Sequence, residues 1–167
     1  LNLAHEQQLA SLAAALLHST SEAHRAAPAG VAAPENPQQD ARWQPLVNPA
    51  EHGDIVGWGC EACSADIEAA ATRAAQVAPI WAGTPPAARA DVLARAADLL
   101  EQRSQPLMGL IMREAGKTLA NAVGEIREAA DFLRYYGAQV AARLDNARER
   151  PLGVVLAISP WNFPLAI

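Results

Sequence analysis

The sequence predicts an α/β fold of which only the front part is present. Two extended runs around residue 50 are separated by turn formers, which predicts a β-hairpin, and apolar residues then recur at helical spacing over residues 64–144. The β-branched run at residues 153–159 predicts a buried strand. A single parallel strand needs neighbours to pair with, so the order hairpin, helices, strand predicts an incomplete α/β domain.

Composition excludes some functions. The 167 residues suit one modest domain, and 51% of them are hydrophobic. A net charge of −5 argues against non-specific binding to nucleic acid or to anionic membranes. No apolar run approaches the roughly 18 to 20 residues of a membrane span, and no signal-peptide pattern follows Leu1. We expect a soluble cytoplasmic protein, cut from a longer chain because it starts without Met and stops inside an element.

The N-terminal residues 1–42 differ in composition from the rest of the chain. Leucines at helical spacing in an Ala-rich background predict an amphipathic helix over residues 1–18. Residues 19–42 are rich in Pro, Ala and polar residues, which predicts a linker or surface segment outside the core. We therefore expect a connecting helix and a Pro/Ala-rich linker over 1–42 and the α/β domain over 43–167. The helix could belong to a different structural unit.

Residues 43–144 are expected to form a hairpin and four helices. The strands are predicted at Trp43–Val47 and Asp54–Gly59, joined by turn-forming residues. Ser64 is expected to cap the first helix, which Pro79 ends near residue 78. The other helices are predicted over residues 86–103, over residues 104–115 with Gly116 as C-cap, and over residues 118–144.

The two cysteines, Cys60 and Cys63, form a single C-x-x-C pair. One such pair has too few ligands for a closed zinc site. A thioredoxin-like redox site needs the pair at a helix N-terminus after a strand. The placement fits, but the intervening Glu61 and Ala62 give this interpretation little support. Two incidental thiols are the favoured interpretation. The histidines lack ligand spacing, so no metal site is predicted; they are His5, His18, His24 and His52.

Charged residues after residue 113 are interpreted as structural. The run Glu114–Lys117 lacks the spacing of a phosphate-binding loop and ends a helix. A solvated helix face is predicted for the next acidic and basic side chains, which are Glu125, Arg127, Glu128, Asp131 and Arg134. Tyr135 and Tyr136 are more typical of packing or interface residues than of catalysts.

The strand predicted at 153–159 runs into Pro160-Trp161-Asn162-Phe163-Pro164. Pro160 ends the strand, and Pro164 suits the first turn of a helix. Ligands of open α/β sheets bind at such strand-to-helix turns. Asn162 therefore has two interpretations: its amide could stabilise a developing oxyanion, or it could cap the helix. The residues alone favour the cap.

The pentapeptide Pro160–Pro164 resembles the Pro-Trp-Asn-Phe-Pro signature of NAD(P)-dependent aldehyde dehydrogenases. Upstream landmarks agree in order over roughly residues 43–167: Asn48-Pro49, Asp54-Ile55-Val56-Gly57, Trp81, Arg89-Ala90 and Glu114-Ala115-Gly116-Lys117. The resemblance implies the N-terminal portion of an aldehyde dehydrogenase fold, with the β-hairpin, helices and first strand of the Rossmann-like NAD-binding sheet.

A narrower resemblance involves residues 113–136, which are similar to the dehydrogenase half of the bifunctional proline utilisation A enzymes. Residues 1–18 look like the segment that joins the two halves there. This implies NAD as cofactor, with FAD only in a proline dehydrogenase half outside this chain. It also implies proline catabolism: oxidation of L-glutamate γ-semialdehyde, which arises from 1-pyrroline-5-carboxylate, to glutamate, by a homo-oligomer when full length.

The resemblance assigns roles to the closing segment. Ile158, Ser159, Pro160 and Trp161 would lie along the nicotinamide–ribose side of NAD, and Asn162 would donate to the oxyanion of the thiohemiacetal and thioester steps. The cysteines of this chain lie far upstream of the family's nucleophile. The catalytic Cys, the Glu base and a ribose-binding Lys are therefore expected beyond residue 167, and the chain is expected to be inactive alone.

Two other functions stay open. The chain could belong to an aldehyde dehydrogenase with a different substrate, since most of the substrate pocket is expected outside it. The Ala-rich helices could instead form an interaction module without catalysis. A stable, monodisperse helical protein would favour that module.

Overall fold

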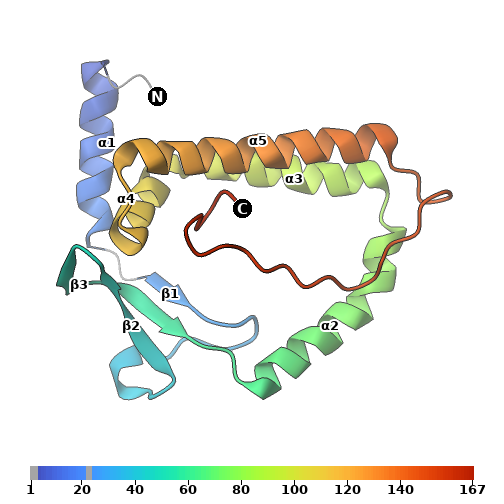
Figure 1. The fold of residues 1–167 in the computed structure, drawn as a ribbon, viewed down its shortest axis with the longest axis horizontal. Coiled ribbons are helices and arrows are strands. Elements are labelled where there is room, and N and C mark those ends of the chain that lie inside the picture. The colour runs from blue at the N-terminus through green and yellow to red at the C-terminus, as the bar shows by residue number, and fades with distance from the viewer. Residues whose placement is uncertain (1–3, 22–23) are drawn as a thin grey trace. The chain divides into compact units, whose positions relative to one another are not determined.

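The structure is a computed structural model that describes residues 4–21 and 24–167 (Figure 1). These residues form helices and a small three-stranded sheet, so the α/β class is confirmed. The element bounds are α1 Glu6–Ser19, β1 His24–Ala26, the 3-10 helix η1 Pro37–Gln39, β2 Trp43–Asn48, β3 Glu51–Cys60, α2 Ser64–Gly83, α3 Pro86–Gln102, α4 Ser104–Ala115 and α5 Leu119–Arg143.

The described residues divide into two compact units. The first takes the chain up to Glu61 together with Arg103–Ile126. The second takes Ala62–Gln102 together with Arg127–Ile167. The sheet, α1 and α4 thus belong to the first unit, and α2, α3 and most of α5 to the second.

The sheet of the first unit has the order β1-β3-β2. The predicted hairpin is confirmed: β2 and β3 are antiparallel, with Trp43 opposite Cys60. On the other side of β3, β1 pairs in parallel, with His24 opposite Gly57. A Cβ at Gly57 would lie 2.4 Å from the carbonyl oxygen of His24, so only glycine allows this close pairing. Residues 19–42 were expected to be a linker or surface segment outside the core; β1 is a short, largely exposed edge strand in this segment, so its pairing was not predicted but its surface position was.

Helix α1 packs on α4 within the same unit. Leu12 of α1 and Met108 of α4 are both 1% exposed, and the side chain of Ser19 fills the space above Gly109. The possibility that this helix belongs to a unit separate from the hairpin is therefore wrong. Its role as a connector to another protein domain stays a prediction.

Arg113 of α4 joins three segments of the first unit. Its guanidinium donates to both carboxylate oxygens of Asp54 in β3, at 2.6 and 3.0 Å, and to the carbonyl oxygen of Ser19 at 2.7 Å. Asn48 donates to the same carboxylate at 3.1 Å. Arg113 is buried, and a bidentate pair of this kind fixes orientation as well as contributing energy. The network holds the end of α1 and the hairpin against α4.

We expect Arg113→Ala to destabilise the first unit by about 2 kcal/mol. Removing one partner of a fully buried pair costs about 3–5 kcal/mol, and the partly exposed Asp54 keeps its contact with Asn48, which lowers the cost. Urea titration of a chain in which Trp81 and Trp161 of the second unit are replaced by Phe measures the change through the fluorescence of the first unit, where Trp43 is buried. The control Arg127→Ala, on an exposed position of α5, is expected to change stability by less than about 0.5 kcal/mol. Equal effects of the two variants would contradict the role of Arg113.

The same network predicts an acid dependence. Hydrogen bonds from Arg113 and then Asn48 hold the pKa of Asp54 below its ordinary value of 3.8. A carboxyl whose folded-state pKa is depressed contributes stability that is present above its unfolded pKa and is lost as the pH falls through the folded pKa. In urea titrations, the free energy of unfolding of wild type should therefore exceed that of Asp54→Asn near neutral pH, and the difference should shrink below about pH 4. A constant difference down to pH 2, or the same convergence for the exposed Asp131→Asn, would contradict this.

Helix α2 departs from two sequence predictions. Cys63, not Ser64, is the N-cap, and the backbone N–H of Cys63 donates to the Asp66 carboxylate at 3.0 Å. Pro79 does not end the helix, which continues to Gly83. The lost N–H leaves one carbonyl without its helical partner, but α2 has no buried residue, so water can solvate that carbonyl.

Helices α3 and α5 form the core of the second unit and run side by side in Figure 1. The two helices are in contact: Ala97 of α3 is fully buried, and Gly137 of α5 faces Ala90 and Leu93 of α3. At the exposed rim, Arg134 of α5 pairs with Asp98 and Glu101 of α3. The contacts place Arg134 on the rim, as the sequence predicted.

Candidate active-site segment

The run expected to be a buried strand, Gly153–Ser159, is extended but unpaired. None of its backbone groups bonds to another described segment, and its apolar side chains face solvent. Ile158 is 86% exposed. The prediction of a buried strand is therefore wrong for this chain. The physical reason is that a strand is stabilised by its neighbours in a sheet, and no described segment supplies them.

The residues after this run form a tight turn. The backbone N–H of Phe163 donates to the carbonyl oxygen of Pro160 at 3.3 Å, with Trp161 and Asn162 at the central positions. Trp161 is 91% exposed. Residues 164–166 form turns instead of a helix, so the expected helix is absent from this segment.

Asn162 is exposed in this turn, and its side chain has no hydrogen-bond partner among the residues that the structure describes. The helix-cap interpretation, which the residues alone favoured, is thus not realised here. The side-chain amide carries two N–H donors without a formal charge. A neutral donor held at a turn is suited to stabilise negative charge that develops on a substrate oxygen.

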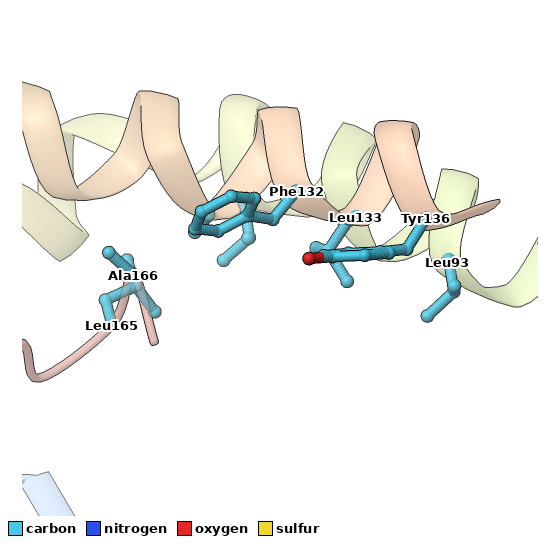
Figure 2. Close-up of a pocket in the computed structure, with 8 residues that line it drawn as sticks. Leu93, Phe132, Leu133, Tyr136, Leu165 and Ala166 are labelled. Atoms are coloured by element: carbon cyan, nitrogen blue, oxygen red, sulfur yellow. The ribbon is translucent and has the colours of Figure 1, made fainter. Parts of the chain in front are cut away.

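The chain after the turn is anchored by apolar contacts. Ala166 is 6% exposed, and Leu165 and Ala166 border an apolar pocket of about 260 Å³ in the second unit. Figure 2 shows the side chains of Phe132 and Tyr136 extending from α5 toward the space that Leu165 and Ala166 border. Tyr136 borders the pocket but is 56% exposed, so its interpretation as a packing or interface residue stays a prediction.

In the described part of the chain, no histidine, lysine or carboxylate side chain is hydrogen-bonded to either cysteine thiol. Cys60, at the end of β3, is a buried free thiol, and its Sγ contacts the carbonyl oxygen of Glu61 at 3.7 Å. Cys63 is an exposed free thiol that caps α2. Within residues 4–21 and 24–167, no group of three or more His, Cys, Asp and Glu side chains could hold a metal ion.

Glu125 and Lys117 correct another prediction. Glu125 was expected on a solvated helix face, but it is 3% exposed and forms an ion pair with Lys117. The signal was present in the sequence, because position 125 falls between the buried Ala122 and Ala129 on one face of α5. The expected C-cap is confirmed: Gly116 has φ +64°, in the left-handed region. These contacts leave Lys117 in a structural role.

The sequence of the chain defines its class. The sequence profile of the aldehyde dehydrogenase family matches residues 36–167, and the chain belongs to this family.

Individual proteins that are similar to the chain are consistent with this family. The chain is 52% identical over its whole length to the bifunctional protein PutA of Salmonella typhimurium, of which it covers 12%. It is 36% identical, over 72% of its length, to a 1-pyrroline-5-carboxylate dehydrogenase of Geobacillus thermodenitrificans, of which it covers 26%. The solved structure of proline utilization A from Bdellovibrio bacteriovorus matches 99% of the chain with a TM-score of 0.80 at 26% identity, and 18% of that structure is covered.

These comparisons confirm the family resemblance and the fold class. The chain spans about an eighth of the length of the PutA relative, so it corresponds to a small part of that protein. No helix in the described part of the chain is both long enough and apolar enough to cross a bilayer. The roles of residues 158–162 stay predictions.

Proposed function

We propose that this chain is the N-terminal part of the dehydrogenase portion of a proline utilisation A enzyme. That portion oxidises L-glutamate γ-semialdehyde, formed from 1-pyrroline-5-carboxylate, to glutamate with NAD. The observation that carries this proposal is the alignment with PutA over all 167 residues, which includes α1 ahead of the family match. A relative named 1-pyrroline-5-carboxylate dehydrogenase is less similar in sequence, at 36% identity over 72% of the chain.

Within this function, Asn162 would donate its amide N–H to the aldehyde oxygen as negative charge develops there. Its exposed and unpartnered side chain supports this role. Preorganised donors stabilise such a charge because they need no reorientation during the reaction. The amide of Asn162 carries no formal charge, so it can donate a hydrogen bond to the oxygen without forming an ion pair with it.

NAD, when bound, accepts the hydride that the aldehyde carbon loses. Ile158, Ser159, Pro160 and Trp161 would line its nicotinamide–ribose side. The residues fit this group: Ile158 and Trp161 present exposed apolar side chains to a flat ring, and the exposed hydroxyl of Ser159 is accessible to a ribose. Cys60 and Cys63 lie far upstream of the closing turn in sequence, which supports a nucleophile located outside these 167 residues.

The alternative is an aldehyde dehydrogenase for a different aldehyde. The two proposals differ in what the adjoining gene encodes. Sequencing the DNA on both sides is expected to give a downstream frame with a nucleophilic Cys and a Glu base, and an upstream flavin-binding barrel. A downstream dehydrogenase frame without a proline dehydrogenase barrel upstream would contradict the proline utilisation A proposal and leave a separate dehydrogenase, whose aldehyde is then identified by comparing kcat/KM for L-glutamate γ-semialdehyde with kcat/KM for other aldehydes. Absence of a nucleophile segment downstream would contradict both and favour a non-catalytic helical module.

A further inference from the structure

A polar pocket lies at the start of α3, within the second unit. It has a volume of about 300 Å³ and is bordered by Arg89 of α3 and by the loop that follows α5. The loop contributes Leu144, Asn146, Glu149 and Arg150. The pocket is separate from the apolar one at Leu165 and Ala166, since the two share no lining residue.

Arg89 is fixed in this pocket but lacks a counter-ion. One terminal nitrogen donates to the side-chain oxygen of Asn146 at 2.6 Å, and the amide of Asn146 donates to the carbonyl oxygen of Thr84 at 3.1 Å. The Nε of Arg89 is buried without a hydrogen-bond partner. No carboxylate in the described ranges pairs with Arg89. Partly buried charges in folded proteins are ordinarily paired, so an unpaired one points to a missing anion.

A second guanidinium borders the same pocket. Arg150 is exposed and has no carboxylate partner among the residues that the structure describes. The one acid in the lining, Glu149, already accepts a hydrogen bond from the backbone N–H of Asp145 at 2.7 Å. Two guanidinium groups against one carboxylate leave the lining with an excess positive charge. Guanidinium groups bind the oxygens of phosphate and carboxylate groups with paired hydrogen bonds.

We propose that the pocket between Arg89 and Arg150 binds a small oxyanion, a phosphate or carboxylate group. The anion would accept hydrogen bonds from the free guanidinium donors and neutralise the excess charge. The same contact would hold the loop after α5 against the start of α3. This site is independent of the proposed dehydrogenase function, because it uses none of residues 158–162.

Hydrogen–deuterium exchange tests the site in the 167-residue chain carrying Leu156→Lys, a substitution outside the pocket lining that is expected to suppress self-association at micromolar concentration. Inorganic phosphate and acetate are titrated in separate arms at constant ionic strength, and the readout is the exchange rate of peptides covering residues 144–151. At ten times the Kd, opening of the loop is expected to slow about tenfold. A saturable effect in either arm supports the site and identifies the preferred group. No saturable effect in either arm overturns it.

A matched pair of variants separates a built site from general charge attraction. Arg150→Ala is expected to weaken binding about tenfold, which reduces the protection at the same concentration to about twofold. Arg143→Ala removes the same charge from the last turn of α5, outside the pocket lining, and is expected to leave the protection unchanged. Equal loss in both variants would overturn the proposal.

Discussion

Asn162→Ala is expected to lower kcat for NAD-dependent aldehyde oxidation by about 10²–10³-fold. The setting is a chimera in which residues 1–167 replace the aligned segment of the Salmonella typhimurium PutA, which matches the whole chain. The reason is the loss of a preorganised donor to the developing oxyanion, which contributes roughly 3–4 kcal/mol. Steady-state kinetics with L-glutamate γ-semialdehyde measure the effect, and Asn121→Ala, at an exposed position on α5, is the control.

A second substitution separates the two interpretations of Asn162. Asp caps helices about as well as Asn, but an ionised carboxylate cannot donate a hydrogen bond. Asn162→Asp should therefore lose as much activity as Asn162→Ala if the side chain is an oxyanion donor. If it acts only as a cap, Asn162→Asp should keep the activity and Asn162→Ala should lower thermal stability. Activity retained in Asn162→Asp would contradict the proposed role.

Self-association through residues 153–159 is the second large effect that we expect. The 167-residue chain should form oligomers at micromolar concentration, because this run leaves a row of backbone groups unpaired and exposes apolar side chains. Short uncharged segments with high β-propensity pair readily with copies of themselves. Leu156→Lys places a charge within the run and is expected to raise the concentration needed for association at least tenfold, a shift that sedimentation velocity measures.

The control for this effect is Leu17→Lys. Leu17 is 73% exposed on α1, so this substitution removes an exposed leucine outside the unpaired run. A monomeric wild-type chain at 100 μM, or an equal shift caused by Leu17→Lys, would contradict strand pairing. A monodisperse and strongly helical chain would also revive the interpretation as an interaction module.

The sequence predicted best the elements that depend on local patterns. The hairpin, α3, α4 and α5 lie close to their predicted positions because periodicity and turn residues determine them locally. The errors concern contacts across the chain. The strand β1 can pair with β3 because Gly57 has no Cβ that would collide with His24. Glu125 can be buried because Lys117 pairs with its carboxylate. A sequence shows the residue types but not which distant segment they meet.

The sequence predicted which residues form the candidate site and that they lie in a turn, but not the conformation of the segments on either side. The Pro160–Pro164 motif located the turn, and the turn is present. The strand before it was inferred from β-branched residues, whose preference is realised only in a sheet. The Arg113 network and the unpaired Arg89 gave no sequence signal, because each joins residues more than fifty positions apart.

The central claim is that this chain supplies one wall of a dehydrogenase site whose nucleophile lies elsewhere. The most direct test is NADH formation from L-glutamate γ-semialdehyde, measured for the purified 167-residue chain and for the chimera. We expect no turnover above background from the chain alone and clear turnover from the chimera. Turnover by the isolated chain, or a folded chimera that binds NAD but is inactive, would contradict this claim.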